Sequence, residues 1–463
     1  MTAPPVPSTL CTAALSVAHQ VADLLGDAEH VAGISREAKD ALPSELFLPA
    51  WQPASLLLGH PGIALLHIRC AQDDAARKVV AHAHLSAAVA SSAAAGPGAA
   101  GSLLLPAHLH ARAYGGYTRL LARCGEVHAA YVRARLAGLV AHRQEYGPGM
   151  AYGDYDTITG LAGEGRSLLL AADHGDEKCA RVLPDVLSFL VEMTRPVGLG
   201  QGKEHQVPGW WCSPDRYLIP RDRQEFPRGD FNVGVAHGIC GPLALLSLAQ
   251  LSGHRVPGQL EAIRSMADWV LSVRRTDQRG TRWPGRIGYE EIVGDPCEMP
   301  RQATGARSRA GWCYGISGIS WTLYLAGQAL CDSRMTDVAA AAVSALLCRP
   351  LEGVTPGDPG FCHGRAGILH TAVRLAAAGH TELWESADRI AQELVGEFDA
   401  HAPFGYPQVL SPPSPQAMPY RTHDPGVLDG AAGIALALAG YADARGKGVI
   451  SERNGWDAMF LMS

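Results

Sequence analysis

A pair of glycines three positions apart, each time opening a long apolar run, recurs along the chain and restricts its fold. The pair occurs six times, at Gly59–Gly62, Gly160–Gly163, Gly238–Gly241, Gly315–Gly318, Gly364–Gly367 and Gly430–Gly433. Two glycines one helical turn apart let the first turn of a helix approach neighbouring backbone closely. The runs that follow are apolar on nearly every side, which is typical of helices in the interior of a protein.

The spacing of the glycine pairs predicts a repeated unit of two helices. Successive pairs start 101, 78, 77, 49 and 66 residues apart, which leaves room for a helix pair and its connections in each unit. Amphipathic runs such as 260–273 and 387–398 lie between the pairs, and strand-like alternation is scarce. We therefore expect an all-α fold, an α/α toroid with six to seven inner helices surrounded by outer ones, formed as one domain over residues 1–463.

One segment, 196–232, breaks the helical pattern. It is rich in glycine, proline, charged and aromatic residues and has no helical period. We interpret it as an insertion within the domain: a lid loop, a small β-containing subdomain, or a docking surface for part of the substrate. Its Trp210-Trp211-Cys212 cluster fits either a peptide-contacting surface or an anchor for the insertion.

Composition argues for an ordinary soluble protein. The chain has 47% hydrophobic residues, a net charge of −6 and a pI near 6.3, so we expect no nucleic-acid partner. We expect neither a secretory signal nor a transmembrane segment, and hence a cytoplasmic location. The 11 cysteines are too widely spaced for a disulfide framework. Small buried residues are the expectation for those in Ala/Leu-rich helical contexts, namely Cys70, Cys124, Cys179, Cys331 and Cys348.

Two of the loops ahead of glycine pairs match closely. Residues 358–364 (DPGFCHG) align with residues 424–430 (DPGVLDG). Only the first copy carries Cys362-His363, and the second has Leu428-Asp429 in their place. The shared frame therefore indicates a structural loop to which the Cys-His pair adds a function.

Equivalent loops of a closed toroid converge at one mouth, where we expect their polar side chains to meet. Cys313 and Cys362 each lie two residues before a repeat glycine, and His363 follows the second. Two thiolates and an imidazole suit zinc, and three protein ligands leave the fourth tetrahedral position open for catalysis. Two thiolate ligands favour sulfur alkylation over water activation. The competing interpretation is a pair of buried cysteines beside a hydrogen-bonded histidine.

His237, just before Gly238, is a candidate general acid or base, and Asp156 could orient it. Each could instead be a capping or loop residue. Arg309 could stabilise enolate charge, although a lone arginine is more often in a surface ion pair. His60 and Cys240 we expect simply to pack.

The loop motifs of this chain resemble those of the lanthionine synthetase C-like proteins, and among them the stand-alone cyclases of class I lanthipeptide pathways. The motifs are YDxxxGxxG at 155–163, AHGxxG at 236–241, WCYGxxG at 312–318, CHGxxG at 362–367 and DGAAGIALAL at 429–438. One local departure is Arg365, a basic residue directly after the CHG triplet.

The resemblance implies an α/α toroid and one Zn²⁺ held by Cys313, Cys362 and His363. It also implies His237 and Asp156 as acid/base candidates, with Arg309 and Tyr314 as further active-site positions. Similar proteins add cysteine thiols of a dehydrated precursor peptide to dehydroalanine or dehydrobutyrine, forming (methyl)lanthionine. A separate dehydratase is then expected as a partner, and a transporter complex is a further candidate.

Three other functions remain open from the sequence. The first is glutathione addition to dehydroamino acids in proteins, which the resemblance also allows. The second is a non-catalytic peptide-binding scaffold that uses the toroid mouth for docking. The third is a glycosidase-like toroid that uses carboxylates, but Asp156 and Asp429 lack a convincing catalytic partner in the sequence.

Overall fold

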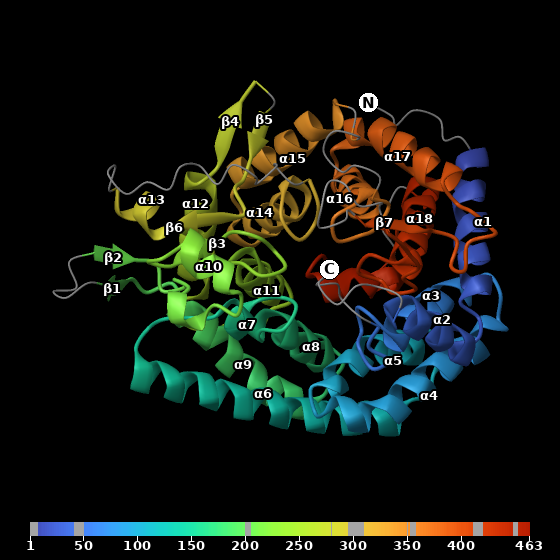
Figure 1. Cartoon of the computed structure of the whole chain (residues 1–463), viewed down its shortest axis with the longest axis horizontal. Coiled ribbons are helices and arrows are strands. Elements are labelled where there is room, and N and C mark those ends of the chain that lie inside the picture. Colours follow the sequence, from blue (N-terminus) through green and yellow to red (C-terminus); the bar gives the residue numbers. More distant parts are fainter. Residues whose placement is uncertain are drawn as a thin grey trace. The chain divides into compact units, whose positions relative to one another are not determined.

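The computed structural model describes residues 8–40, 51–199, 205–278, 280–294, 310–349, 351, 358–410, 420–447 and 452–463. Helices dominate it, and its strands are short (Figure 1). The chain divides into two compact units. The first comprises Met1–Cys124 and Leu347–Met459, and the second comprises Gly125–Leu346 and Phe460–Ser463.

The first unit is built around α3, α16 and α18. The helix α18 packs against α1, α3, α16 and α17, and α3 packs against α4 and α5; Figure 1 shows α1 alongside α18. The bounds of the helices are α1 Ser8–Leu24, α2 Ala28–Asp40, α3 His60–Cys70, α4 Arg77–Ala95, α5 Ala99–Tyr114, α16 Arg365–Ala377, η3 Thr381–Leu383, α17 Trp384–Gly396, α18 Ala431–Lys447 and η4 Glu452–Phe460.

The second unit is built around α11, which packs against α8, α12 and α14. Its helices also include α6, whose first turns belong to the first unit. Their bounds are α6 Thr118–Tyr146, α7 Tyr152–Tyr155, α8 Leu161–Asp173, α9 Glu177–Glu192, η1 Pro214–Arg216, α10 Pro220–Glu225, α11 Cys240–Leu251, α12 Gln259–Ser272, α13 Tyr289–Val293, α14 Ile316–Leu330 and α15 Ser333–Leu347.

Each of the six glycine pairs lies at the start of a buried helix, as the sequence predicted. These helices are α3, α8, α11, α14, α16 and α18. Every residue of α3 is buried, as are the first ten of α11 and the first twelve of α14. By contrast, α17 buries only one face, formed by Trp384, Ala387, Ile390, Ala391 and Leu394. The inner and outer helices expected from the apolar pattern are therefore both present.

The second glycine of the motif is required by a close backbone contact. A Cβ on Gly318 would lie 2.0 Å from the carbonyl oxygen of Trp312, and one on Gly163 would lie 2.0 Å from that of Thr157. In both cases the contacted residue is six positions earlier, in the loop that precedes the helix. The loop therefore folds tightly onto the first helical turn, which fixes the direction of its side chains.

The described strands form four antiparallel pairs. These are β1 Val197–Leu199 with β2 His205–Val207, β3 Asp230–Asn232 with β6 Arg286–Gly288, β4 Arg275–Asp277 with β5 Gly280–Arg282, and β7 Gln408–Leu410 with β8 Tyr420–Thr422. Three of these strands lie in the segment expected as an insertion. Within it, Trp210 and Cys212 are buried, so these two members of the cluster pack inside the second unit.

The expectation for the helical cysteines is confirmed for Cys70, Cys124 and Cys179, which are buried, and is wrong for Cys331 and Cys348, which are exposed. Cys331 is the cap that follows α14 and has a left-handed backbone, with φ of 53°. It thus lies just past the last buried turn, where the apolar pattern no longer applies. Among the described helices, none is both long and apolar enough to cross a membrane.

Candidate active site

His237 and Asp156 form a hydrogen-bonded pair within the second unit. The Nδ1 atom of His237 lies 2.7 Å from a carboxylate oxygen of Asp156. Asp156 is buried and also accepts the backbone N–H groups of Thr159 and Gly160, each at 2.7 Å. Because a carboxylate accepts hydrogen bonds, Nδ1 of His237 carries the hydrogen and Nε2 is left on the other side of the ring.

The environment of His237 makes it more basic than an ordinary histidine. Burial on its own lowers the pKa of His237, but the hydrogen bond and the charge of Asp156, together with the charge of Cys313, outweigh burial and raise the pKa. The side chain is 41% exposed, so solvent or a substrate reaches the ring. Such a histidine can transfer a proton at neutral pH.

Backbone hydrogen bonds join the loop of His237 to the loop of Cys313. The carbonyl oxygen of Cys313 accepts from the N–H groups of Val235 at 2.9 Å and Ala236 at 3.3 Å. Tyr314, the next residue, has its ring centroid 6.4 Å from that of His237. Burial is the main cause that raises the pKa of Tyr314, so its hydroxyl stays protonated at neutral pH.

Asn232 links these two loops and was not singled out from the sequence. Its side-chain N–H donates to the Tyr314 hydroxyl at 2.8 Å, and its side-chain oxygen accepts from Gly234 at 3.0 Å. Its backbone oxygen accepts from Ile239 at 2.9 Å. Because an asparagine at the edge of an irregular segment resembles any turn residue, the signal available was only its position five residues before His237.

Asp230 fixes the strand that carries Asn232. This fully buried carboxylate accepts the hydroxyls of Tyr152, at 2.6 Å, and Tyr217, and the Nε–H of Arg286 at 2.6 Å. The Arg286 guanidinium lies 4.1 Å from the centre of the Phe226 ring, a cation–π contact. Tyr152 and Arg286, which lie outside the predicted insertion, thus hold its last strand, β3, in place beside the site through Asp230.

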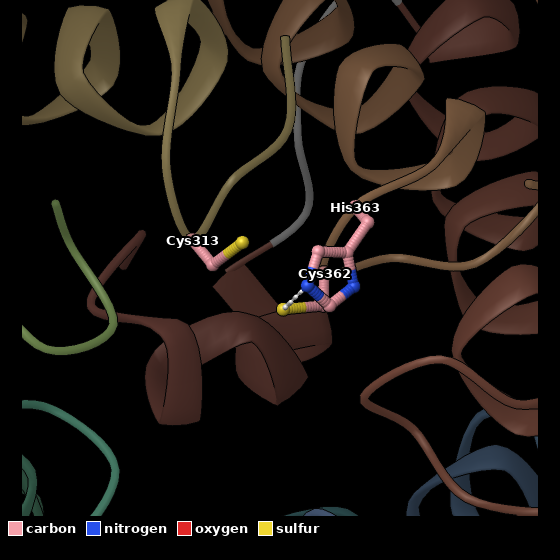
Figure 2. A group of neighbouring side chains, drawn as sticks. All are labelled: Cys313, Cys362 and His363. Atoms are coloured by element: carbon pink, nitrogen blue, oxygen red, sulfur yellow. Dashed lines mark hydrogen bonds between the residues drawn. The ribbon is translucent and has the colours of Figure 1, made fainter. Parts of the chain in front are cut away.

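Cys362 and His363 lie in the loop before α16, in the first unit (Figure 2). The Sγ atom of Cys362 is 3.8 Å from Nε2 of His363, and the Cys362 side chain is buried. The Nδ1 atom of His363 is 3.2 Å from a carboxylate oxygen of Asp429. Figure 2 also labels Cys313, which is buried in the loop before α14 and belongs to the second unit.

The separation of the Cys362 and His363 ligand atoms fits a tetrahedral zinc ion. With ordinary Zn–S and Zn–N bond lengths, sulfur and nitrogen on such an ion lie roughly 3.6 Å apart, close to the 3.8 Å found here. The carboxylates of Asp358 and Asp429 lie close to His363, with one oxygen of each and a ring nitrogen all within 4.8 Å of one another. Cys362 and His363 are therefore spaced as two ligands of one zinc ion, with acidic groups beside the histidine.

The remaining residues considered from the sequence occupy other surroundings. Arg309 lies outside the described residues. Arg365, the first residue of α16, pairs at 2.5 Å with Glu397, the residue that caps the end of α17, so this basic residue has a role in joining the two helices. His60 and Cys240 are buried, as expected, and His60 Nδ1 is 2.9 Å from His84 Nδ1.

These features define a class of helical proteins in which glycine-pair loops present cysteine, histidine and aspartate side chains at the starts of buried helices. The family model described as lanthionine synthetase C-like protein matches residues 50–447. The chain belongs to this family.

Two relatives are informative. Nisin biosynthesis protein NisC from Lactococcus lactis subsp. lactis is 24% identical over 216 residues, which are 47% of this chain and 48% of that protein. The match thus spans about half the length of this curated relative. The solved structure of nisin cyclase is similar with a TM-score of 0.71 and 18% identity, covering 93% of this chain and 95% of that one. This likeness confirms the predicted fold class, an all-α α/α toroid.

Proposed function

We propose that this chain is a zinc-dependent lanthipeptide cyclase. It adds cysteine thiols of a dehydrated precursor peptide to dehydroalanine or dehydrobutyrine and so forms (methyl)lanthionine thioether rings. The observation that carries the proposal is the Cys362–His363 pair, whose sulfur and nitrogen lie at the spacing of two zinc ligands, in a lanthionine synthetase C-like chain. The names of the similar proteins, nisin cyclase and NisC, point to the same reaction.

The proposed ligands of the zinc are Cys313, Cys362 and His363. When bound, zinc would stabilise the thiolate form of a substrate cysteine at neutral pH, and the two protein thiolates would leave that sulfur reactive. The chain contributes the rest of the chemistry. Cys362 is buried and His363 is half exposed. Solvent and a peptide can therefore reach this ligand pair from the side of His363.

We propose His237 as the general acid that protonates the α-carbon. The reaction forms a bond from sulfur to the β-carbon of the dehydrated residue, breaks the carbon–carbon double bond and needs a proton at the α-carbon. The thiol gives up one proton and the α-carbon gains one, so the mass of the peptide is unchanged. His237, held through Nδ1 by Asp156 at 2.7 Å, delivers the proton from Nε2.

The partners follow from the substrate. We propose that a separate dehydratase makes the dehydrated peptide and that the reaction takes place in the cytoplasm, with a transporter complex as a further candidate partner. Arg309 and Tyr314 are proposed as additional active-site residues. The hydroxyl of Tyr314, on the loop next to His237, can donate a hydrogen bond to a developing enolate oxygen.

The test uses purified chain, a dehydrated cysteine-containing peptide and a thiol-alkylating reagent, followed by mass spectrometry. Ring closure leaves the peptide mass unchanged and removes alkylatable thiols faster than in buffer alone. Glutathione addition instead adds the full mass of glutathione. We expect about one zinc per chain, and we expect Cys313→Ala to lose both zinc and ring formation. Retained metal and retained ring formation in that variant would reject the ligand assignment.

A further inference from the structure

The two loops that match in sequence also pair in space, within the first unit. The backbone N–H of Cys362 donates to the carbonyl oxygen of Leu428 at 2.7 Å. A Cβ on Gly360 would lie 2.8 Å from the carbonyl oxygen and 2.9 Å from the Cα of Asp429. The backbone of Asp429 therefore lies directly against the loop that carries Cys362 and His363.

The position of Asp429 is itself fixed from several sides. The side-chain amide of Gln408, in β7, donates to the carbonyl oxygen of Asp429. The Asp424 side chain accepts from the N–H of Gly426 at 2.6 Å, and the Asp424 carbonyl accepts from Ala431 at 2.9 Å. Asp429 thus projects from a tightly hydrogen-bonded turn, so its side chain has few positions available.

From this turn the carboxylate of Asp429 reaches the imidazole of His363, 3.2 Å from Nδ1. A carboxylate only accepts hydrogen bonds, so this contact places the hydrogen of the neutral ring on Nδ1. The lone pair is then on Nε2, the nitrogen that lies 3.8 Å from the Cys362 sulfur. A neutral imidazole with its lone pair on that side is the form that binds a metal.

We propose that Asp429 is a positioning residue that sets the tautomer and the ring orientation of His363 for metal binding. The inference rests on the proposed zinc site. Carboxylates that accept the second N–H of a metal-bound histidine commonly have this effect. The duplicated loop thereby contributes twice: one copy supplies the ligand His363, and the other supplies Asp429 at the equivalent position to orient it.

Asp358 offers a matched control. One of its carboxylate oxygens lies within 4.8 Å of a ring nitrogen of His363 and of a carboxylate oxygen of Asp429, so replacing it removes an equal charge close to the site. Its carboxylate accepts from the N–H of Gly360 at 2.8 Å, a turn contact that an asparagine oxygen can also make. Asp358→Asn therefore tests the effect of local charge without touching the contact to His363.

The experiment compares the full chain with Asp429→Ala, Asp429→Asn and Asp358→Asn. Zinc affinity is measured by competition with a chromogenic chelator, and Co²⁺ spectra report the ligand field. We expect Asp429→Ala to weaken zinc binding 10- to 100-fold, in the range found for such partners, and to shift the Co²⁺ ligand-field bands. Thiolate-to-Co²⁺ charge-transfer bands persist, because the cysteines are unchanged. Asp429→Asn, which retains an acceptor oxygen, binds more tightly than the alanine variant, and Asp358→Asn stays within about threefold of wild type.

A second measurement reads the tautomer directly. In ¹⁵N-histidine NMR of the zinc-loaded chain, with the His363→Ala variant assigning the signal, we expect a protonated Nδ1 on His363. Circular dichroism and thermal unfolding without metal establish that each variant is folded.

Zinc affinity and Co²⁺ spectra of Asp429→Ala equal to wild type would overturn the positioning role alone. Equal losses in the alanine and asparagine variants would also overturn it, because charge or direct ligation would then be responsible. A wild-type chain that binds no zinc would overturn the proposed site together with this inference.

Discussion

Asp156 holds His237 through a 2.7 Å contact to Nδ1 while two backbone N–H groups hold Asp156 in turn. The carboxylate is therefore held in place by the backbone as well as by the histidine, which fixes the orientation of the His237 ring. Because the charge and the hydrogen bond of Asp156 raise the pKa of His237, removing the carboxylate should change the pH at which the histidine titrates.

The first prediction concerns this pair. His237→Ala should slow ring formation 10²- to 10⁴-fold, the usual contribution of a general acid or base. Asp156→Asn keeps an oxygen for the two backbone N–H groups but loses the charge, so the pKa of His237 falls. If His237 donates the proton, activity is lost as pH rises through that pKa, and this loss should occur at lower pH in Asp156→Asn. Rates from pH 5 to 9 test it, and an unshifted profile would contradict the assigned roles.

The second prediction concerns the metal. Cys362→Ala should lose zinc and ring formation, because without bound zinc the substrate thiol is not stabilised as a thiolate. For the same reason, a chelator should inactivate the wild type until zinc is returned. Metal analysis and the alkylation assay measure both. Cys331→Ser is the matched control, since Cys331 is an exposed cysteine at the end of α14, and it should keep full zinc content and activity. Equal activity in Cys362→Ala and wild type would exclude the proposed ligand.

A third prediction concerns acid stability and arises from a cluster of buried histidines in the first unit. His67 and His84 both contact the carbonyl oxygen of Leu25, at 3.0 and 2.8 Å, and His84 also contacts His60. Burial is the largest cause that lowers the pKa values of His60 and His84 to about 4 and that of His67 to about 3. All three are thus neutral in the folded chain at neutral pH.

The unfolded chain takes up protons on these histidines near pH 6.5, whereas the folded chain takes them up only near pH 4 or below. Their lowered pKa values therefore reduce the free energy of unfolding as pH falls from about 6.5 to about 4. Denaturant unfolding across this range measures the slope. His84→Gln should give a shallower slope, because one titrating group is removed, and a slope as steep as that of wild type would contradict the prediction.

The sequence predicted the repeat well because its signal is local. A glycine at position 318 is required by the carbonyl of Trp312, six residues earlier, so motif and structure lie within one short segment. The frame shared by the loops of Cys362 and Asp429 was visible for the same reason. Their pairing was not, since the contact between His363 and Asp429 joins residues 66 positions apart and depends on how two helices pack.

The contacts of Asn232 were also not predictable from the sequence. Its three hydrogen bonds involve Tyr314, Gly234 and Ile239. A single asparagine in a sequence does not reveal which partners it will have in the folded chain. The wrong expectation for Cys331 has a related cause. An apolar helical pattern gives the buried face of a helix, but whether the residue after the last turn is covered depends on neighbouring elements.

The fourth prediction follows from Asn232, which is buried. Asn232→Ala leaves the N–H of Gly234 and the hydroxyl of Tyr314 without this partner, which should cost about 1–3 kcal/mol of unfolding free energy. It should also slow ring formation, because the loops of His237 and Tyr314 lose the side-chain hydrogen bonds of Asn232 that link them. Denaturant unfolding and the alkylation assay give the two values. Asn232→Asp, which keeps the acceptor for Gly234 but loses the donor to Tyr314, should fall between alanine and wild type in stability.

The fifth prediction compares two glycines in opposite surroundings. Gly318→Ala would place a Cβ 2.0 Å from the Trp312 carbonyl and 2.9 Å from a Val235 methyl, so the loop must shift at a cost of about 1–3 kcal/mol. Gly138, in α6, has nothing within 4 Å of the position where a Cβ would lie. Alanine there should stabilise the chain by roughly 0.5–1 kcal/mol, because alanine loses less backbone freedom in a helix.

Unfolding free energies of the two variants should therefore change in opposite directions, which a general intolerance of glycine replacement would not produce. Because the shifted loop carries Cys313 one residue after Trp312, Gly318→Ala should also bind zinc more weakly, whereas Gly138→Ala should bind it as wild type does. A Gly318→Ala chain with wild-type stability would mean that the loop accommodates a methyl group freely. The glycine pair would then owe its recurrence to something other than the close contact between loop and helix.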